Sequence, residues 1–360
     1  MRIRIEKRPA PSALLLWSTP LLALGLTLAA GVVLFAGLGV DAGAALYHIF
    51  IEPVVTLSGL GEVLIKAAPL VLIGVGLAIG FRASVWNIGA EGQLTIGAVA
   101  AGGIALAFWD SEGAWIMPLM AVAAIAGGMA WAAIPAFLKA RFNVSEILTS
   151  LMLTYVAGLL LGALVYGPWK DPEGFNFPQS RMFNDSETLS LLVEGTRIHM
   201  GVPLAVIIAV IAFILLERTV LGFEIKVAGL APAAARHAGF SARRLVWLSF
   251  MISGGLSGLA GMLEVAGPIG QLVPVITPGY GFTAIIVAFL GRLHPLGVLA
   301  SGLLMALTYV GGENAQIAVG LPRAATGVFQ GLLLFFLLAT DFIARYRIRV
   351  ATTRQNEVRP

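Results

Sequence analysis

A polar segment between two long apolar runs holds the residues best suited to chemistry. Asn87, Glu91 and Gln93 lie there, and the glycines on both sides of Glu91 favour an unwound or kinked chain. An ionisable group near the centre of a bilayer is costly and usually faces a protein interior or a pathway. Irregular backbone at that depth needs the same shelter. Two interpretations follow: Glu91 lines a pathway, or it caps a broken helix or pairs with Arg82.

Composition points to lipid as the main solvent. Of the 360 residues, 58% are hydrophobic and 12% are charged, whereas soluble domains have about 45–50% apolar and about 25% charged residues. The absence of cysteine excludes disulfides, thiolate metal sites and cysteine nucleophiles. The net charge of +4 comes from basic residues in short segments that flank apolar runs. This clustering fits the positive-inside rule better than a nucleic-acid partner.

Apolar runs of spanning length predict the elements that position the polar segment. They lie near 13–38, 61–80, 93–108, 116–138, 147–166, 202–216, 245–266, 281–291, 296–311 and 326–343. The sequence therefore predicts an all-α integral membrane protein, a polytopic helix bundle of about ten transmembrane segments. The run 281–291 is short for a crossing, so the alternative is eight full spans plus a broken or re-entrant pair formed with 296–311.

The distribution of basic residues predicts the orientation. Most of the 23 Lys and Arg fall on one side if the N-terminus is cytoplasmic, so both termini are expected to be cytoplasmic. The predicted organisation is a basic N-terminus at 1–12, a transmembrane domain at 13–343 and a basic tail at 344–360. Within the domain, 167–201 forms an external loop and 217–244 a cytoplasmic loop.

The cytoplasmic loop contains a short helix. Pro232 suits a first helical turn, the following alanines propagate the helix, and Gly239 ends it. Such a small-sided helix fits a groove on a partner protein, with Arg236 and His237 as polar contacts. The alternative is an amphipathic connector with a basic face.

Several motifs carry a family resemblance. The run Phe-Arg-Ala-Ser-Val-Trp-Asn-Ile-Gly-Ala-Glu-Gly-Gln at 81–93 closely resembles the signature of ABC importer permeases of the branched-chain amino acid, monosaccharide and nucleoside superfamily. Its core looks like the nucleoside and simple-sugar branch. Residues 144–155, 234–239 and 279–291 are similar to that branch, in matching order, within roughly 60–340. Ser145 departs from the pattern, where an Asn is more usual.

The resemblance implies roles for particular residues. The helix that couples transport to an ATPase would include Ala234, Ala235, Arg236, His237 and Gly239. The candidates for the translocation path are Asn87, Glu91 and Gln93, with Trp86 and Phe282 either stacking on a solute or filling space. No residue is expected to be catalytic or to bind a metal.

The sequence lacks the phosphate-binding Gly-x-x-x-x-Gly-Lys-Ser/Thr loop. ATP would therefore be used by partner ATPase subunits, and the chain itself would bind no cofactor and be no enzyme. The resemblance implies a second permease subunit, identical or paralogous, and an extracytoplasmic solute-binding protein that meets loops near 41–60, 167–201 and 312–325. Lipid is a further partner, and nucleic acid is not.

The expected function is import of a small neutral polar solute, a nucleoside first, through the bacterial cytoplasmic (inner) membrane as a multi-pass protein. The alternatives are a monosaccharide ABC permease and an ion-coupled secondary transporter. The latter also uses broken helices and polar groups at the bilayer midplane. A companion ATPase would separate the two classes.

Overall fold

The computed structural model describes residues 2–7 and 13–351. The remaining residues of the predicted basic segments 1–12 and 344–360 lie outside the described residues, so those segment boundaries stay predictions. The chain divides into two compact units, one formed by both ends of the chain, up to Ile51 and from Gly311, and one formed by Glu52–Val310.

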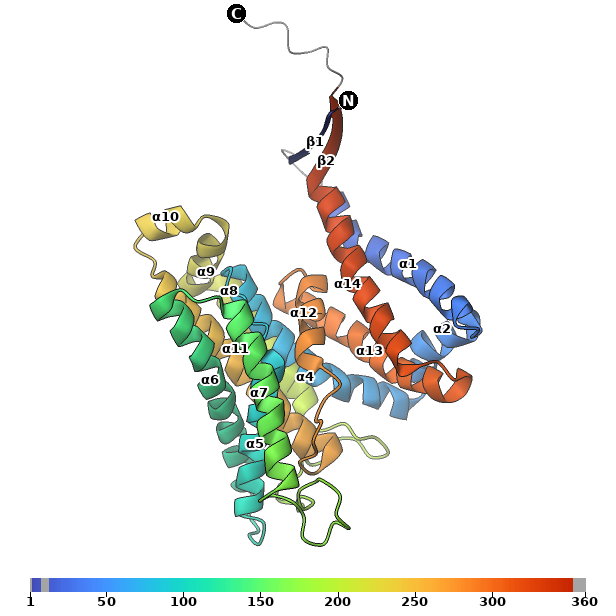
Figure 1. The fold of residues 1–360 in the computed structure, drawn as a ribbon, viewed down its shortest axis with the longest axis vertical. Helices are drawn as coiled ribbons and strands as arrows, with labels where there is room; N and C mark the ends of the chain where they lie inside the picture. Colours follow the sequence, from blue (N-terminus) through green and yellow to red (C-terminus); the bar gives the residue numbers. More distant parts are fainter. Residues whose placement is uncertain (1, 8–12, 352–360) are drawn as a thin grey trace, which may run out of the picture. The chain divides into compact units, whose positions relative to one another are not determined.

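The terminal unit contains helices from both ends of the chain and a strand pair (Figure 1). Its elements are β1 (Arg2–Lys7), α1 (Ala13–Gly37), α2 (Ala42–Phe50), the end of α13 (Pro295–Val319), α14 (Arg323–Arg345) and β2 (Tyr346–Ala351). β1 pairs with β2 in antiparallel register, which the sequence did not predict. The pairing brings the strand that precedes α1 next to the strand that follows α14.

The larger unit carries the polar segment and the predicted coupling helix. Its elements are α3 (Glu52–Val55), α4 (Leu57–Arg82), α5 (Ala90–Ala107), α6 (Ile116–Phe142), α7 (Glu146–Tyr166), α8 (Gly201–Arg218), α9 (Val220–Leu230), α10 (Pro232–His237), α11 (Ala242–Glu264), a π-helical turn (Val265–Ile269), α12 (Tyr280–Leu290) and the start of α13. α4 is almost wholly buried and packs against α8, α11 and α12. It is the central helix of this unit.

The described residues confirm the helical membrane bundle. Nine of their helices are long and apolar enough to cross a bilayer. α12 is not, because its 11 residues extend about 16 Å at 1.5 Å per residue, and the hydrocarbon core is about 30 Å thick. α13 has 25 residues. The alternative of a broken pair formed by 281–291 and 296–311 is therefore wrong for 296–311, which lies within this long helix.

The tenth crossing is interrupted rather than absent. Gly270, at its start, accepts a hydrogen bond from Phe183 N in the loop that precedes α8. Leu293, at its end, accepts one from the side chain of Arg82, near the opposite end of α8. Residues 270–293 therefore pass from one end of the unit to the other, partly as extended chain and partly as α12. We call this segment the interrupted crossing.

Glycines bring α5, α6 and α11 into backbone contact. A Cβ added to Gly258 would lie 2.1 Å from the carbonyl oxygen of Ala124 and 3.1 Å from the Cα of Gly128. Close approach of this kind is how membrane helices associate without a hydrophobic driving force.

Gly258→Ala is therefore expected to lower the stability of the purified protein by about 3 kcal/mol, because the added methyl meets rigid backbone. The thermal unfolding midpoint in detergent measures this loss. Gly162→Ala on α7 is the matched control, since nothing lies within 4 Å of that position. Equal midpoints for the two variants would contradict the packing argument.

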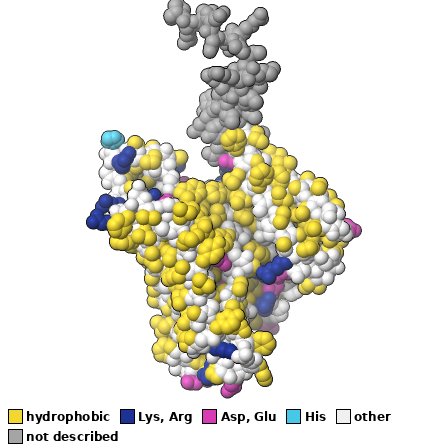
Figure 2. Space-filling model, in the orientation of Figure 1, with side chains coloured by type: hydrophobic (Ala, Val, Ile, Leu, Met, Phe, Trp, Pro, Cys, Tyr) yellow, Lys and Arg dark blue, Asp and Glu magenta, His cyan; other side chains and the backbone are white. Residues whose placement is uncertain are grey.

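The outer sides of the larger unit are apolar. Hydrophobic side chains cover most of the visible faces of α6 and α7, and basic side chains and a histidine gather around α10 (Figure 2). On α7, Leu148, Tyr155 and Leu159 are 61%, 63% and 75% exposed. A water-soluble protein rarely leaves so continuous an apolar face open, whereas lipid or another membrane subunit would cover it.

Candidate functional site

The break between α4 and α5 is held by a pair of side-chain amides. Asn87 donates from Nδ2 to Oε1 of Gln93 over 2.8 Å, and Gln93 donates from Nε2 to Oδ1 of Asn87 over 3.0 Å. The two residues are 3% and 1% exposed. Their polar atoms are thus paired with each other within the protein, and the pair stabilises the bend. Their predicted role in the path stays untested.

Neighbouring helices contribute hydroxyl groups to the same bend. Ser253 of α11 accepts a hydrogen bond from Asn87 Nδ2 over 2.9 Å, and Ser150 of α7 accepts one from Ile88 N over 3.2 Å. These contacts replace the helical hydrogen bonds that the break removes, as irregular backbone in a membrane requires. The sequence alone did not single out either serine.

The carboxylate of Glu91 binds the start of α12. It accepts hydrogen bonds from Thr277 Oγ1 and from Gly281 N, each at 2.5 Å. Glu91 lies in the first turn of α5 and Gly281 in the first turn of α12, so two helix N-termini meet at one negative charge. Each N-terminus carries about half a positive charge, which the carboxylate balances. The geometry fits the interpretation of Glu91 as a helix cap, and the helix that it caps is α12. The alternative pairing of Glu91 with Arg82 is wrong.

The approach of these two helix ends requires a glycine. A Cβ on Gly281 would lie 2.2 Å from the backbone nitrogen of Glu91. Gly279, which precedes α12, has a φ of +102°, in the region that glycine adopts readily. The glycines near 279–281 that resemble the family pattern therefore have a direct steric role.

Aromatic rings line the open side of α12. Trp86 is 36% and Phe282 39% exposed. Trp86 stacks with Phe289 at a centroid distance of 6.1 Å and contacts Phe81 at 4.9 Å. Because Phe282 and Phe289 are seven residues apart, they share one face of α12. Trp86 and Phe282, predicted to contact solute, thus belong to one aromatic surface, which also includes Phe289.

The predicted coupling helix exists as α10 and has only 6 residues. Ala234, Arg236 and His237 are exposed, whereas Ala235 is 4% exposed. Gly239 has a φ of +82°, and the following residue donates its N–H to the carbonyl of Ala235, which closes the helix. The five residues therefore divide into an outward surface and one buried anchor.

The loop that carries α10 contacts the end of α4. A Cβ on Gly229 of α9 would lie 1.9 Å from the carbonyl oxygen of Arg82, and Ser84 Oγ donates to the carbonyl of Gly229 over 3.4 Å. A cleft of about 390 Å³ separates α10 from the bend, lined among others by Val85, Glu146 and Ala235. The α9–α10 loop and the polar segment thus adjoin.

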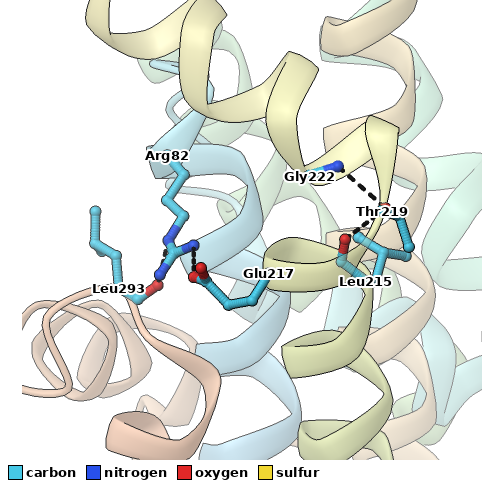
Figure 3. A network of polar contacts seen from close by, with 6 residues as sticks. All are labelled: Arg82, Leu215, Glu217, Thr219, Gly222 and Leu293. Atoms are coloured by element: carbon cyan, nitrogen blue, oxygen red, sulfur yellow. Dashed lines mark hydrogen bonds and ion pairs between the residues drawn. The ribbon is translucent and has the colours of Figure 1, made fainter.

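Arg82, which the sequence analysis named only as an alternative partner of Glu91, is a functional candidate in its own right. Its Nε donates to the carbonyl of Leu293 over 2.8 Å, and its Nη1 lies 2.7 Å from Oε1 of Glu217 (Figure 3). The available signals in the sequence were the basic residue Arg82 and the acidic residue Glu217, each near the end of an apolar helix. The pairing itself depends on contacts between residues far apart in the chain.

The loop between α7 and α8 covers the start of the interrupted crossing. Besides the bond from Phe183 to Gly270, Ser180 N donates to the carbonyl of Leu272 over 2.9 Å, and Leu189 N donates to that of Ala266 over 2.8 Å. This region, expected as an external loop at 167–201, is therefore a structured cover. Its sidedness stays a prediction.

A buried histidine lies in this cover. His199 is 2% exposed, its Nδ1 accepts a hydrogen bond from Gly201 N, and its Nε2 has no hydrogen-bond partner among the described residues. Burial lowers the pKa of His199 to about 4 from an ordinary value of about 6.5. Between those values an opened loop binds a proton that the closed loop does not, so the closed form loses stability as pH falls.

Acidification from about pH 6.5 to 4 is expected to lower the stability of the closed loop, relative to the opened loop, by up to about 3 kcal/mol. This loss is measured by hydrogen exchange of residues 189–201, corrected for intrinsic rates, in the unsubstituted protein and in His199→Gln. Burial raises the pKa of Glu187 in the same loop, which acts in the opposite direction, so the comparison with the variant isolates the histidine. The same pH response in both proteins would contradict this assignment.

Comparisons with known proteins agree with this architecture. A family described as the permease component of branched-chain amino acid transport systems matches residues 59–338. The glucose ABC transporter permease protein of Haloferax volcanii is 37% identical, over 100% of this chain and 97% of that protein. The guanosine ABC transporter permease protein of Bacillus subtilis is 31% identical, over 91% and 94% of the two chains.

A nucleoside ABC transporter permease protein of Lactococcus lactis subsp. cremoris is 27% identical, over 90% of this chain and 91% of that protein. These matches extend across both the polar segment and α10. The chain therefore belongs to the family of branched-chain amino acid transport permease components and is a transmembrane permease subunit of an ABC transporter.

Proposed function

We propose that this permease imports a small neutral polar solute, with a nucleoside as the first candidate. The observation that carries the proposal is the aromatic surface of Trp86, Phe282 and Phe289 beside the interrupted crossing. Aromatic faces stack on nucleobases, and this stacking is worth about 1–3 kcal/mol per base. The carboxylate of Glu91 is engaged with α12, so this group does not select a cationic solute.

A monosaccharide is the second candidate. The Haloferax volcanii relative, with 37% identity over the whole chain, is named for glucose, whereas the Bacillus subtilis and Lactococcus lactis relatives are named for guanosine and nucleosides. Competition separates the candidates: excess guanosine should suppress uptake of labelled nucleoside while excess glucose leaves it unchanged, and the reverse pattern assigns the sugar.

The energy would come from partner subunits. The exposed face of α10, with Ala234, Arg236 and His237, fits a groove on an ATPase, and the chain has no phosphate-binding loop of its own. ATP would be bound only by that partner, with no cofactor bound by this chain. α10 would then lie on the cytoplasmic side, with both termini, and the cover between α7 and α8 on the outer side.

The outer cover would receive solute from an extracytoplasmic binding protein. A second permease subunit, identical or paralogous, would complete the transporter, and the open apolar face of α7 is available for such a subunit or for lipid. The proposed location is the bacterial cytoplasmic membrane. ATP-driven closure of the ATPase subunits would displace α10 and alternate access to the aromatic surface.

Reconstitution tests the proposal. The permease is incorporated into proteoliposomes with the ATPase, binding protein and any second permease encoded beside it, and uptake of labelled guanosine is followed. The expected result is uptake that requires ATP on the α10 side and survives collapse of ion gradients by ionophores. Uptake by the permease alone, driven by an ion gradient, would show a secondary transporter instead.

A further inference from the structure

We infer that Arg82 is the positioning residue through which motion of the α9–α10 loop reaches the interrupted crossing. The inference rests on the proposed coupling role of α10 and goes beyond it, because it assigns the route inside the permease. It depends on a set of contacts at the end of the larger unit that carries α10.

Arg82 joins three separate parts of the fold. It is the last residue of α4. Its Nε reaches the carbonyl of Leu293, just after α12, over 2.8 Å, and its Nη1 reaches Glu217, near the end of α8, over 2.7 Å (Figure 3). A planar guanidinium presents donors in a fixed fork, so the two partners are held in a defined relation to each other. A lysine ammonium does not provide that geometry.

The same residue is in backbone contact with the coupling loop. The space beside its carbonyl oxygen is so small that a Cβ on Gly229 would come within 1.9 Å. Ser84, two residues later, adds a hydrogen bond to the carbonyl of Gly229. Since peptide groups are stiff and these leave no free space, a displacement of α9 toward the membrane pushes directly on the end of α4.

The segment 82–91 also holds α12 at both ends. Glu91 binds the N-terminal end through Gly281 N and Thr277, and Arg82 binds the chain beyond the C-terminal end through Leu293. A short helix held at both ends by one segment moves with that segment. The contacts therefore form a continuous physical connection from Gly229 to α12 and its aromatic surface.

The surroundings leave room for the movement. The side chains of Arg82 and Glu217 are 19% and 34% exposed. They line an open cleft of about 320 Å³ together with Lys226, Gly229 and Leu293. A pair in such a cleft can change partners without leaving a charge buried, whereas a fully enclosed pair cannot.

The test follows the two ends of the connection separately. Because the chain has no cysteine, single cysteines label cleanly with monobromobimane. Leu230→Cys reports on the coupling loop and Ile285→Cys on the half-buried side of α12, each in the complete transporter in nanodiscs. Bimane fluorescence is recorded before and after ATP with vanadate. Each reporter is combined with Arg82→Gln, with Arg82→Lys and with Arg218→Gln, which removes an exposed arginine at the same end.

In Arg82→Gln the reporter at 230 should respond to ATP as before, while the response at 285 is lost and uptake falls about tenfold, within the range usual for coupling between sites. Basal ATP hydrolysis should stay unchanged. Arg218→Gln should match the unsubstituted protein. Responses at both positions together with normal uptake in Arg82→Gln would overturn the inference.

If the Arg82→Gln variant does not assemble, Arg82→Lys tests the inference instead. Lysine keeps the charge pair with Glu217, but its donors all lie on one nitrogen and do not span Glu217 and Leu293 as the guanidinium fork does, so the 285 response should be weakened while the 230 response persists. A lysine variant that behaves like the unsubstituted protein would overturn the inference. No ATP response at 230 in the unsubstituted transporter would instead count against the proposed role of α10.

Discussion

Glu91→Gln is expected to reduce uptake about 100-fold or more while leaving the assembled transporter intact. Glutamine has the same shape, and it can accept from Gly281 N and donate to Thr277, so the change removes chiefly the negative charge. Two helix N-termini then face each other without a counter-charge, and in partly buried sites each such interaction contributes up to about 2 kcal/mol. Uptake per assembled complex, with assembly followed by gel filtration, is the measurement.

Glu62→Gln is the matched control for Glu91. Glu62 forms an ion pair with Arg197 near the cover, at 2.5 Å, and exposed pairs of this kind contribute about 0–1 kcal/mol. Uptake should therefore change little in this variant. Glu91→Asp keeps the charge on a shorter side chain and should retain part of the uptake. Unchanged uptake in Glu91→Gln would refute a role for the charge, both as a cap of α12 and as part of a path.

Two substitutions in α10 are expected to abolish uptake for different reasons. Arg236→Glu places a negative charge on the exposed face, so the permease should fold normally but lose stimulation of its ATPase partner. Ala235→Glu forces a charge into a position that is 4% exposed, and burying an unpaired charge costs several kcal/mol. The helix should then leave its seat on the permease.

Copurification and proteolysis separate these outcomes. Arg236→Glu should retain the proteolysis pattern of the α9–α10 loop and lose about tenfold or more of the uptake, the size of loss expected for a disrupted coupling. Ala235→Glu should make the same loop rapidly cleaved. Ala234→Ser, an exposed and small change, is the control for both. Full uptake and ATPase stimulation in Arg236→Glu would contradict α10 as the coupling surface.

The candidate site shows how far residue type and spacing can be interpreted. The polar segment was identified because acidic and amide side chains are rare between spanning apolar runs, and its break was predicted from the adjacent glycines. The partners were not predictable. Asn87 and Gln93 pair with each other, and Glu91 binds residues about 190 positions away. Sequence spacing says nothing about such distances unless a fold is already known.

The same division holds for the crossings. Apolar runs located the nine spanning helices of the described residues, because a helix in lipid must satisfy its own backbone and bury apolar side chains along its whole length. That requirement is local. The run 281–291 is also apolar, but it lies in a crossing that is partly extended chain and whose backbone is satisfied by other segments, so its short length did not show how the chain crosses.

The sequence by itself thus determined the membrane bundle, the location of the break and the presence of the small-sided helix α10, since each depends on composition or on neighbours within a few turns. Only the tertiary structure decided that Glu91 caps α12, that Arg82 holds Glu217 and Leu293, and that Ala235 is an anchor and not a contact surface. Hydrogen bonds and ion pairs extend over about 3 Å, so they form only between groups that folding has already placed together.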